Sequence, residues 1–222
     1  HRGDYDISLK VDTMYEKTRH LVKEFINARS TKEIVFTSGT TDSINRIVNG
    51  YFKRYLKEND EVLITKSEHA SNILPWFALE KELGIVIKYV NLSDKNEVTI
   101  DNLEKIITNK TKVVSLAHVT NVIGDVRDIK RISKLCHDNG ILLVVDAAQS
   151  IAHVKVDVQD MDIDFMAFSS HKMYGPTGIG VLYGKFPLLQ EIVPRNYGGD
   201  MNAMFTRDGY MELKDLPSRL EA

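Results

Sequence analysis

Five short polar clusters in the sequence contain residue types that could form one binding site. They hold hydroxyls, histidines, an aspartate and a lysine, and each follows directly on a short apolar run. Ligands of open α/β sheets bind beyond the carboxyl ends of the strands, so five such clusters indicate one site lined from several strands. The clusters are SGTTDS (38–43), KSEHASN (66–72), HVTN (118–121), DAAQS (146–150) and SSHK (169–172).

Lys172 has the most specific chemistry among these residues. Most lysines are solvated surface charges, but this one follows the apolar run 164–168 and precedes a glycine-rich turn. Partial burial at such a place lowers the pKa of the ammonium group and makes the amine a nucleophile that forms Schiff bases with carbonyl compounds. Pyridoxal phosphate (PLP) is one such compound. It also needs a carboxylate for its ring nitrogen and an anion site for its phosphate.

Other clusters offer both of these groups. Asp146 ends the most apolar run in the chain, where a carboxylate is costly unless it caps a helix, binds a metal or pairs with a protonated ring nitrogen. No second carboxylate lies near it in sequence, which disfavours a metal. Thr40 and Thr41 stand at a predicted helix start, where a phosphate is favoured, although a helix cap without ligand has the same pattern. Ser169 and His171 could add hydrogen bonds to that phosphate.

Histidine and amide side chains complete the candidate set. His69 could stack on an aromatic ring or move protons, and it could equally be an ordinary loop residue. The same ambiguity applies to His118 and Asn121. Gln149 could donate to or accept from the ligand that Asp146 contacts.

Alternating helices and strands must position these clusters. Helical periodicity appears in 14–26, 44–56 and 129–136, and Asn139-Gly140 is a typical helix stop. Several β-rich runs are apolar throughout, which is typical of a sheet covered on both faces. We therefore predict an α/β fold with a mostly parallel sheet flanked by helices. The last two runs are joined by a turn too short for a helix, so that pair should be antiparallel and the sheet mixed. The runs are 33–37, 61–65, 85–90, 112–117, 141–146, 164–168 and 179–183.

Composition limits the classes of function. The 222 residues are 43% hydrophobic and 27% charged, with 29 basic and 31 acidic residues, so nucleic acid is not an expected partner. No apolar run has the length of a membrane span. The single cysteine, Cys136, excludes an internal disulfide and fits a reducing cytoplasm. It lies on the apolar face of the predicted helix 129–136, which predicts burial and low reactivity of its thiol. The chain does not begin with Met, and we expect it to be part of a longer protein.

Six motifs in this order resemble the class V aminotransferase family, and within it the SufS-type (group II, NifS-like) cysteine desulfurases. The likeness extends from His1-Arg2-Gly3 to Glu221-Ala222. It implies the PLP-dependent transferase fold type I. Residues 1–222 would be an incomplete PLP-binding large domain, without an N-terminal segment and a C-terminal small domain. The motifs are FINARS (25–30), FTSGTTDSIN (36–45), SEHASNILPW (67–76), AHVTNVIG (117–124), VVDAAQS (144–150) and SSHKMYGPTGIGVLY (169–183).

The resemblance implies a role for each matching residue. Lys172 would bind the aldehyde of PLP, Asp146 would pair with the ring nitrogen, and Gln149 would approach the ring hydroxyl. His69 would stack on the ring and move protons, and Asn121 would lie near the ring and the substrate. The phosphate would be held by Thr41, Ser169, His171 and the backbone near Thr40.

The implied reaction converts L-cysteine to L-alanine and transfers the sulfur as an enzyme persulfide for iron–sulfur cluster assembly. Expected partners are L-cysteine, a sulfur-acceptor protein of the SufE/SufU type and a second copy in a homodimer. The persulfide-forming cysteine, the arginine for the substrate carboxylate and a threonine donated across the dimer would lie outside this chain, which should be inactive alone.

Two alternative functions stay open: selenocysteine lyase or another class V activity, and a non-catalytic truncated chain or scaffold. Many relatives have EHHAN where this chain has EHASN (68–72).

Overall fold

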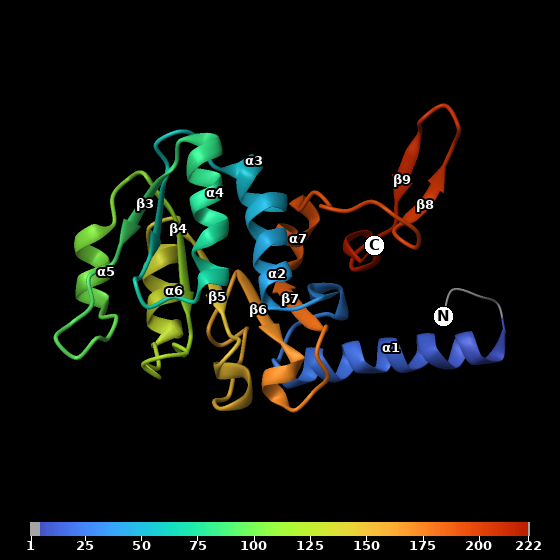
Figure 1. The fold of residues 1–222 in the computed structure, drawn as a ribbon, viewed down its shortest axis with the longest axis horizontal. Helices are drawn as coiled ribbons and strands as arrows, with labels where there is room; N and C mark the ends of the chain where they lie inside the picture. Colours follow the sequence, from blue (N-terminus) through green and yellow to red (C-terminus); the bar gives the residue numbers. More distant parts are fainter. Residues whose placement is uncertain (1–4, 222) are drawn as a thin grey trace.

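A seven-stranded sheet forms the centre of the molecule (Figure 1). The computed structural model describes residues 5–221; the His1-Arg2-Gly3 part of the predicted resemblance lies outside them, as does Ala222. The strands are β1 (Ile34–Thr37), β2 (Glu61–Ile64), β3 (Val86–Tyr89), β4 (Thr111–Ala117), β5 (Leu142–Asp146), β6 (Phe165–Ser169) and β7 (Gly180–Gly184).

The order of these strands is β1-β7-β6-β5-β4-β2-β3. The pairs from β3 to β6 are all parallel, whereas β7 runs antiparallel to both of its neighbours, β6 and β1. Both the predominantly parallel sheet and the antiparallel pairing of the last two predicted runs are therefore confirmed. Each predicted run also coincides with a strand to within one or two residues.

Helices cover the sheet on both faces (Figure 1). One apolar layer includes Ile132 and Cys136, and the other includes Ile44, Phe52 and Trp76. The central strands are buried between these layers, which explains why their sequences are apolar throughout. The helices are α1 (Asp6–Phe25), α2 (Thr40–Ile47), α3 (Lys53–Tyr55), α4 (Leu74–Leu83), α5 (Ile100–Ile106), α6 (Ile129–Asp138) and α7 (Phe186–Glu191).

The three predicted helical stripes have different environments. The stripe in 44–56 runs through α2, a π-helical segment (Val48–Phe52) and α3. The stripe in 129–136 is the buried face of α6, which ends at Asp138 with Asn139 as its C-cap. The stripe in α1 is different, because Met14 is 68% exposed and Phe25 is 55% exposed. The described part of this chain therefore leaves much of that apolar face uncovered.

A hairpin of β8 (Asn202–Phe205) and β9 (Met211–Leu213), which is not among the strands predicted from the sequence, projects from the body (Figure 1). It forms a separate two-stranded sheet. No helix within residues 5–221 is both long enough and apolar enough to cross a membrane.

Candidate active site

Nine of the ten candidate residues line one cavity of about 200 Å3. The tenth, His118, is buried just after β4 and is not part of the lining. The cavity lies where β4, β5 and β6 end, and the first turn of α2 forms part of its wall. The structure thus brings the five polar clusters to one place, while the role of each residue stays a prediction. The nine are Thr40, Thr41, His69, Asn121, Asp146, Gln149, Ser169, His171 and Lys172.

Lys172 stands just beyond the end of β6. All five residues of this strand are buried, and the chain then enters a short 3-10 turn (Ser170–Met173) that carries His171 and Lys172. Tyr174 ends the turn in the left-handed conformation with φ of 65°. Lys172 is half-buried and lines the cavity, whereas His171 is more exposed. A rigid strand therefore determines where the amine is presented.

Ser169, the last residue of β6, is joined to the start of α2. The backbone N–H of Thr40 donates to Oγ of Ser169 over 2.8 Å, and the hydroxyls of the two residues lie 2.7 Å apart. Gly39 precedes the helix with φ of 152°, which side chains rarely adopt. The N–H groups of a first helical turn lack helical acceptors, so this end of the cavity suits an anion such as phosphate.

Ser71 holds the ring of His69. The backbone N–H of Ser71 donates to Nδ1 of His69 over 3.2 Å, and Oγ of Ser71 lies 3.0 Å from the same nitrogen. Because Nδ1 accepts, the neutral ring carries its proton on Nε2. Oγ of Ser71 also lies 2.7 Å from Oγ1 of Thr41. One serine of the EHASN segment thus links the histidine to the first turn of α2.

Asp146 is a buried carboxylate, only 5% exposed, at the end of β5. Its Oδ1 accepts a hydrogen bond from the N–H of Ala148 over 2.9 Å. Burial raises the pKa of this carboxyl; the Ala148 N–H lowers it, the charge of Glu68 raises it, and Lys172 and His69 lower it. Because desolvation dominates, a cationic group of a ligand in the cavity would stabilise the ionised form of Asp146.

Asn121 lies at the tip of a short hairpin that follows β4. Val119 and Val126 form an antiparallel bridge, and the N–H of Thr120 donates to the carbonyl of Asp125 over 3.1 Å. Asn121 is exposed on the rim of the cavity, and the half-buried Gln149 reaches it from the turn after β5. The side-chain amides of Asn121 and Gln149 can therefore both form hydrogen bonds with a ligand in the cavity.

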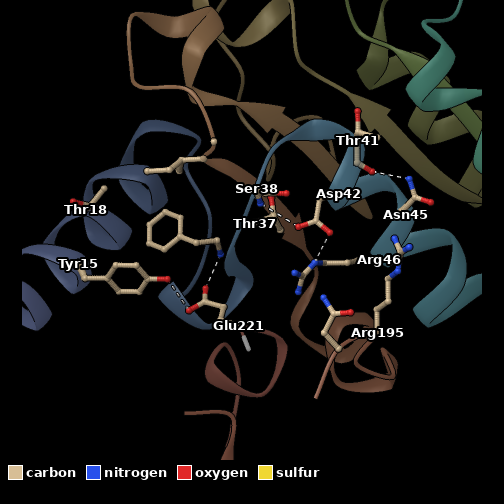
Figure 2. A pocket seen from close by; sticks show the side chains of 14 residues that line it. Tyr15, Thr18, Thr37, Ser38, Thr41, Asp42, Asn45, Arg46, Arg195 and Glu221 are labelled. Atoms are coloured by element: carbon tan, nitrogen blue, oxygen red, sulfur yellow. Dashed lines mark hydrogen bonds and ion pairs between the residues drawn. The ribbon is translucent and has the colours of Figure 1, made fainter. Parts of the chain in front are cut away.

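A larger cavity of about 850 Å3 lies beside the first one and shares Thr41 with it (Figure 2). Its wall carries the ion pair of Arg46 with Asp42, whose N and O atoms are 2.9 Å apart, and also Arg195. The lysine, the histidines and Asp146 line the smaller cavity. The residues with candidate catalytic chemistry are therefore in the smaller cavity, and the two cavities meet at Thr41.

Three residues near the site were missed in the sequence analysis. Ser71 lies in a motif that drew attention to its histidine only. Glu68 and Arg127 form an ion pair in which both side chains are fully buried, yet they are 59 positions apart in sequence. No local sequence pattern predicts a pair of such distant residues. The one available signal was that Glu68 is directly next to the candidate His69.

Comparison with known proteins agrees with this geometry. A sequence model described as aminotransferase class-V matches residues 1–222. A probable cysteine desulfurase of Halalkalibacterium halodurans is 44% identical over 201 residues, which are 90% of this chain and 50% of that protein. A probable cysteine desulfurase of Staphylococcus epidermidis is 43% identical over 222 residues, all of this chain and 54% of that protein. The chain thus spans about half the length of these relatives.

Solved structures show the same relationship. The cysteine desulfurase CsdA from Escherichia coli superposes with a TM-score of 0.92 at 37% identity, over 100% of this chain and 55% of that one. The apo cysteine desulfurase from Thermococcus onnurineus NA1 superposes with a TM-score of 0.94, also at 37% identity and with the same coverage. The fold is therefore that of the fold type I large domain in these enzymes. With its whole length matched, its sheet in this arrangement and its polar clusters around one cavity, the chain belongs to the class V aminotransferase family.

Proposed function

We propose that residues 1–222 are the PLP-binding large domain of a cysteine desulfurase. The observation that carries the proposal is the meeting of Lys172, Asp146 and the Thr40–Ser169 pair around one cavity. Relatives named cysteine desulfurases, 40–44% identical to the chain, support the choice of activity.

The chemistry of the cavity lining fits PLP. The cofactor has an aldehyde, a ring nitrogen that can carry a proton and a phosphate, and the lining offers a partner for each. Lys172 supplies an amine for the aldehyde. Asp146, buried and with a raised pKa, is a carboxylate that a protonated ring nitrogen would stabilise. The N–H groups at the start of α2, with Thr41, Ser169 and His171, would take the phosphate.

When bound, PLP supplies an electron-accepting ring that acidifies the α-hydrogen of an attached amino acid. Asp146 would hold the ring nitrogen protonated through its carboxylate. Nζ of Lys172 would hold the cofactor by its aldehyde, and the same amine is placed to move the α-proton of the substrate. His69 would lie against the ring and donate or receive a proton at Nε2, since Nδ1 is engaged by Ser71. Gln149 would approach the ring hydroxyl, and Asn121 would orient the ring and the substrate.

The net reaction that we propose is L-cysteine plus an enzyme thiol giving L-alanine plus an enzyme persulfide. One C–S bond breaks and one S–S bond forms, and the thiol proton balances the new C–H bond. A sulfur acceptor of the SufE/SufU type would take the sulfur for iron–sulfur cluster assembly in the cytoplasm. These assignments rest on the family resemblance.

We also propose that the protein is a homodimer. The exposed apolar face of α1 includes Met14 and Phe25, and the β8–β9 hairpin exposes Phe205 and Tyr210. Exposed apolar surface of this kind is typical of an interface. Sedimentation of the complete polypeptide as an active monomer would contradict this assembly.

The test of the function uses the complete polypeptide that contains this sequence. With PLP and L-cysteine it should form alanine and, with a reductant, sulfide in equal amounts. L-Selenocysteine as a competing substrate distinguishes a selenocysteine lyase. Absence of alanine from cysteine while PLP is bound would contradict the desulfurase assignment, and failure to bind PLP would contradict the cofactor assignment as well.

A further inference from the structure

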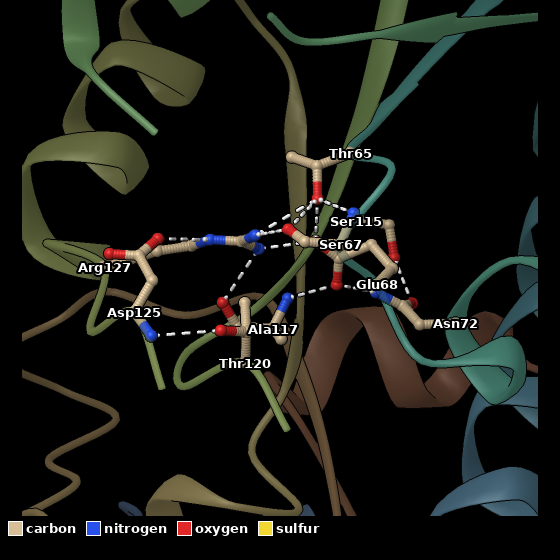
Figure 3. A network of polar contacts seen from close by, with 9 residues as sticks. All are labelled: Thr65, Ser67, Glu68, Asn72, Ser115, Ala117, Thr120, Asp125 and Arg127. Atoms are coloured by element: carbon tan, nitrogen blue, oxygen red, sulfur yellow. Dashed lines mark hydrogen bonds and ion pairs between the residues drawn. The ribbon is translucent and has the colours of Figure 1, made fainter. Parts of the chain in front are cut away.

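A buried ion pair connects the two loops that carry His69 and Asn121. Glu68 precedes His69, and Arg127 closes the hairpin whose tip is Asn121. Nη1 of Arg127 donates to Oε1 of Glu68 (Figure 3). Neither side chain has any exposed surface. The pair lies outside the cavity lining, so it does not touch a ligand there.

Glu68 uses both carboxylate oxygens to join its own loop to β4. Oε2 accepts from the backbone N–H of Ala117 over 2.6 Å and from Nδ2 of Asn72 over 3.0 Å. Oε1 accepts from the hydroxyl of Thr65 over 2.7 Å as well as from Arg127. The residues before and after His69 are thus fixed to the strand whose end forms the cavity wall.

Arg127 makes the matching connections from the hairpin side. Nη1 also donates to the carbonyl of Ala117 over 3.1 Å, and Nη2 donates to the hydroxyls of Ser67 over 2.8 Å and Thr65 over 3.1 Å. The backbone N–H of Arg127 donates to the carbonyl of His118 over 2.9 Å, which closes the hairpin. A planar guanidinium group can serve all these acceptors at once, whereas an ammonium group cannot.

Stability alone is a poor reason for such a pair. Transfer of two charges out of water costs several kcal/mol per ion, and apolar side chains of similar volume often stabilise a fold as well or better. The pair does, however, give each loop one position relative to β4 and to the other loop. Glu68 is also one of the charges that raise the pKa of Asp146, so neutralisation of Glu68 by Arg127 limits that effect.

We propose that Glu68 and Arg127 are positioning residues of the PLP site, acting through His69 and Asn121. The proposal rests on the proposed function for the identity of the ligand. The geometric part, that the pair holds the two loops, does not depend on the ligand. The two parts can therefore be tested separately.

The test compares Arg127→Met with a control that breaks a partly buried ion pair elsewhere in the fold. Lys185→Met is the control, because Lys185 pairs with the buried Asp164, which immediately precedes β6 at the end of this strand opposite Ser169 and the cavity. In the complete polypeptide, Arg127→Met should weaken PLP binding roughly tenfold or more, since small displacements of positioning groups have effects of that order. It should also shift the absorbance spectrum of the bound cofactor and its pH dependence. Lys185→Met should change the affinity for PLP by no more than about twofold and leave the absorbance spectrum and its pH dependence as in the wild type.

Two conservative variants test the same proposal if Arg127→Met does not fold. Arg127→Lys retains the charge without the planar group, and Glu68→Gln retains the shape without the charge. Both should weaken PLP binding and shift the absorbance spectrum in the same direction as Arg127→Met. If these variants fall in stability like Lys185→Met but keep wild-type PLP affinity and spectrum, the pair is only structural and the proposal is wrong.

Hydrogen exchange without cofactor tests the geometric part. The N–H of Asn72 bonds to the carbonyl of His69, and the N–H of Thr120 bonds within the hairpin. Both amides should exchange roughly tenfold faster in Arg127→Met than in Lys185→Met. Unchanged exchange would overturn the proposal even if PLP binding were altered. A wild-type protein that takes up no PLP would contradict the proposed function while leaving this measurement valid.

Discussion

Gly39 and Gly180 pack so closely that a Cβ atom added to Gly180 would lie 2.4 Å from Cα of Gly39. Gly180 begins β7 and pairs with Thr37 of β1 on one side and with Ser169 of β6 on the other. The close approach brings the start of α2 over the end of β6, where the N–H of Thr40 reaches Oγ of Ser169. Two glycines thus determine the shape of the end of the cavity where the phosphate is predicted to bind.

Gly180→Ala should therefore lower the stability of the fold and distort the predicted phosphate-binding end of the cavity. A methyl group would displace the Gly39 backbone, and overpacking of this kind destabilises a protein by about 1–3 kcal/mol. The loss of the Thr40–Ser169 bonds should also weaken PLP binding. The measurements are urea unfolding and equilibrium binding of PLP.

Gly184→Ala is the matched control in the same strand. A Cβ atom there would meet the buried side chains of Leu189, at 2.7 Å, and Phe165, at 2.9 Å, at the other end of β7. It should lower stability but leave PLP affinity unchanged. Equal effects of both variants on PLP affinity would contradict the role given to the glycine pair.

Ser71→Ala should reduce turnover without unfolding the protein. It removes the hydroxyl that contacts both Thr41 and His69, while the backbone N–H of Ser71 still reaches Nδ1 of His69. Loss of one hydrogen-bonding hydroxyl of this kind corresponds to about 0.5–1.5 kcal/mol, or roughly a two- to tenfold lower kcat/KM. Ser71→Thr retains a hydroxyl and should restore most of the activity. Wild-type kcat/KM in Ser71→Ala would show that the backbone contact alone suffices.

The sheet and the gathering of the site could be predicted because their signals are local. Apolar runs such as 141–146 report burial on both faces, and a polar residue after each run reports a strand end. The environment of Met14 could not be read in the same way, because helical spacing shows that a face is apolar and not what covers it. Glu68 and Arg127 were missed for a related reason: the pairing of distant charges depends on how loops meet in space.

Asp146→Asn should stabilise the cofactor-free protein while it harms the enzyme. Burial raises the pKa of Asp146 in the folded state, so the folded protein holds this proton more tightly than the unfolded chain does. The free energy of unfolding therefore falls as pH rises from the ordinary aspartate value of 3.8 through the raised value. Asparagine cannot ionise, so the advantage of the variant should grow over that range in urea unfolding at several pH values. A constant difference at all pH values would contradict the pKa direction.

The same variant should separate cofactor binding from catalysis. Without the carboxylate the ring nitrogen loses the partner that keeps it protonated, and turnover should fall by at least a hundredfold, since the loss of a partner in a buried charge pair costs about 3–5 kcal/mol. PLP retention should fall much less, because Lys172 and the phosphate contacts remain. Near-normal turnover with PLP bound would remove Asp146 from the proposed mechanism.

Lys172 should be the one lysine to which borohydride fixes the cofactor. It is the lysine that lines the cavity with Asp146 and the Thr40–Ser169 pair. After reduction of the complete polypeptide, peptide mass spectrometry should find PLP on the peptide around Lys172. In Lys172→Ala no PLP should be fixed at any position. PLP trapped on another lysine of the unmodified protein would make the site assignment wrong.

Cys136 should be inert although it is the one thiol of the sequence. It is buried in the layer that α6 forms against the sheet, which confirms the predicted burial. Burial, followed by the charge of Asp164, raises the pKa of the thiol to about 12, so almost no thiolate exists near neutral pH. It also lies close to the start of β5, whereas Asp146 is at the other end of that strand. Alkylation by iodoacetamide should therefore be slow in the folded protein and fast in urea.

Cys136→Ser should consequently leave desulfuration by the complete polypeptide within about twofold of wild type, while the buried hydroxyl lowers stability by about 1–3 kcal/mol. Cys136→Ala, which introduces no polar group, is the control that separates the hydroxyl from the loss of sulfur. The 222-residue chain by itself should release no sulfide from cysteine, because a nucleophilic thiolate is required and Cys136 cannot supply one. A persulfide on Cys136 during turnover, or sulfide release by this chain alone, would contradict the burial argument, since the sulfur atom would have to leave the core to reach a substrate at the far end of β5.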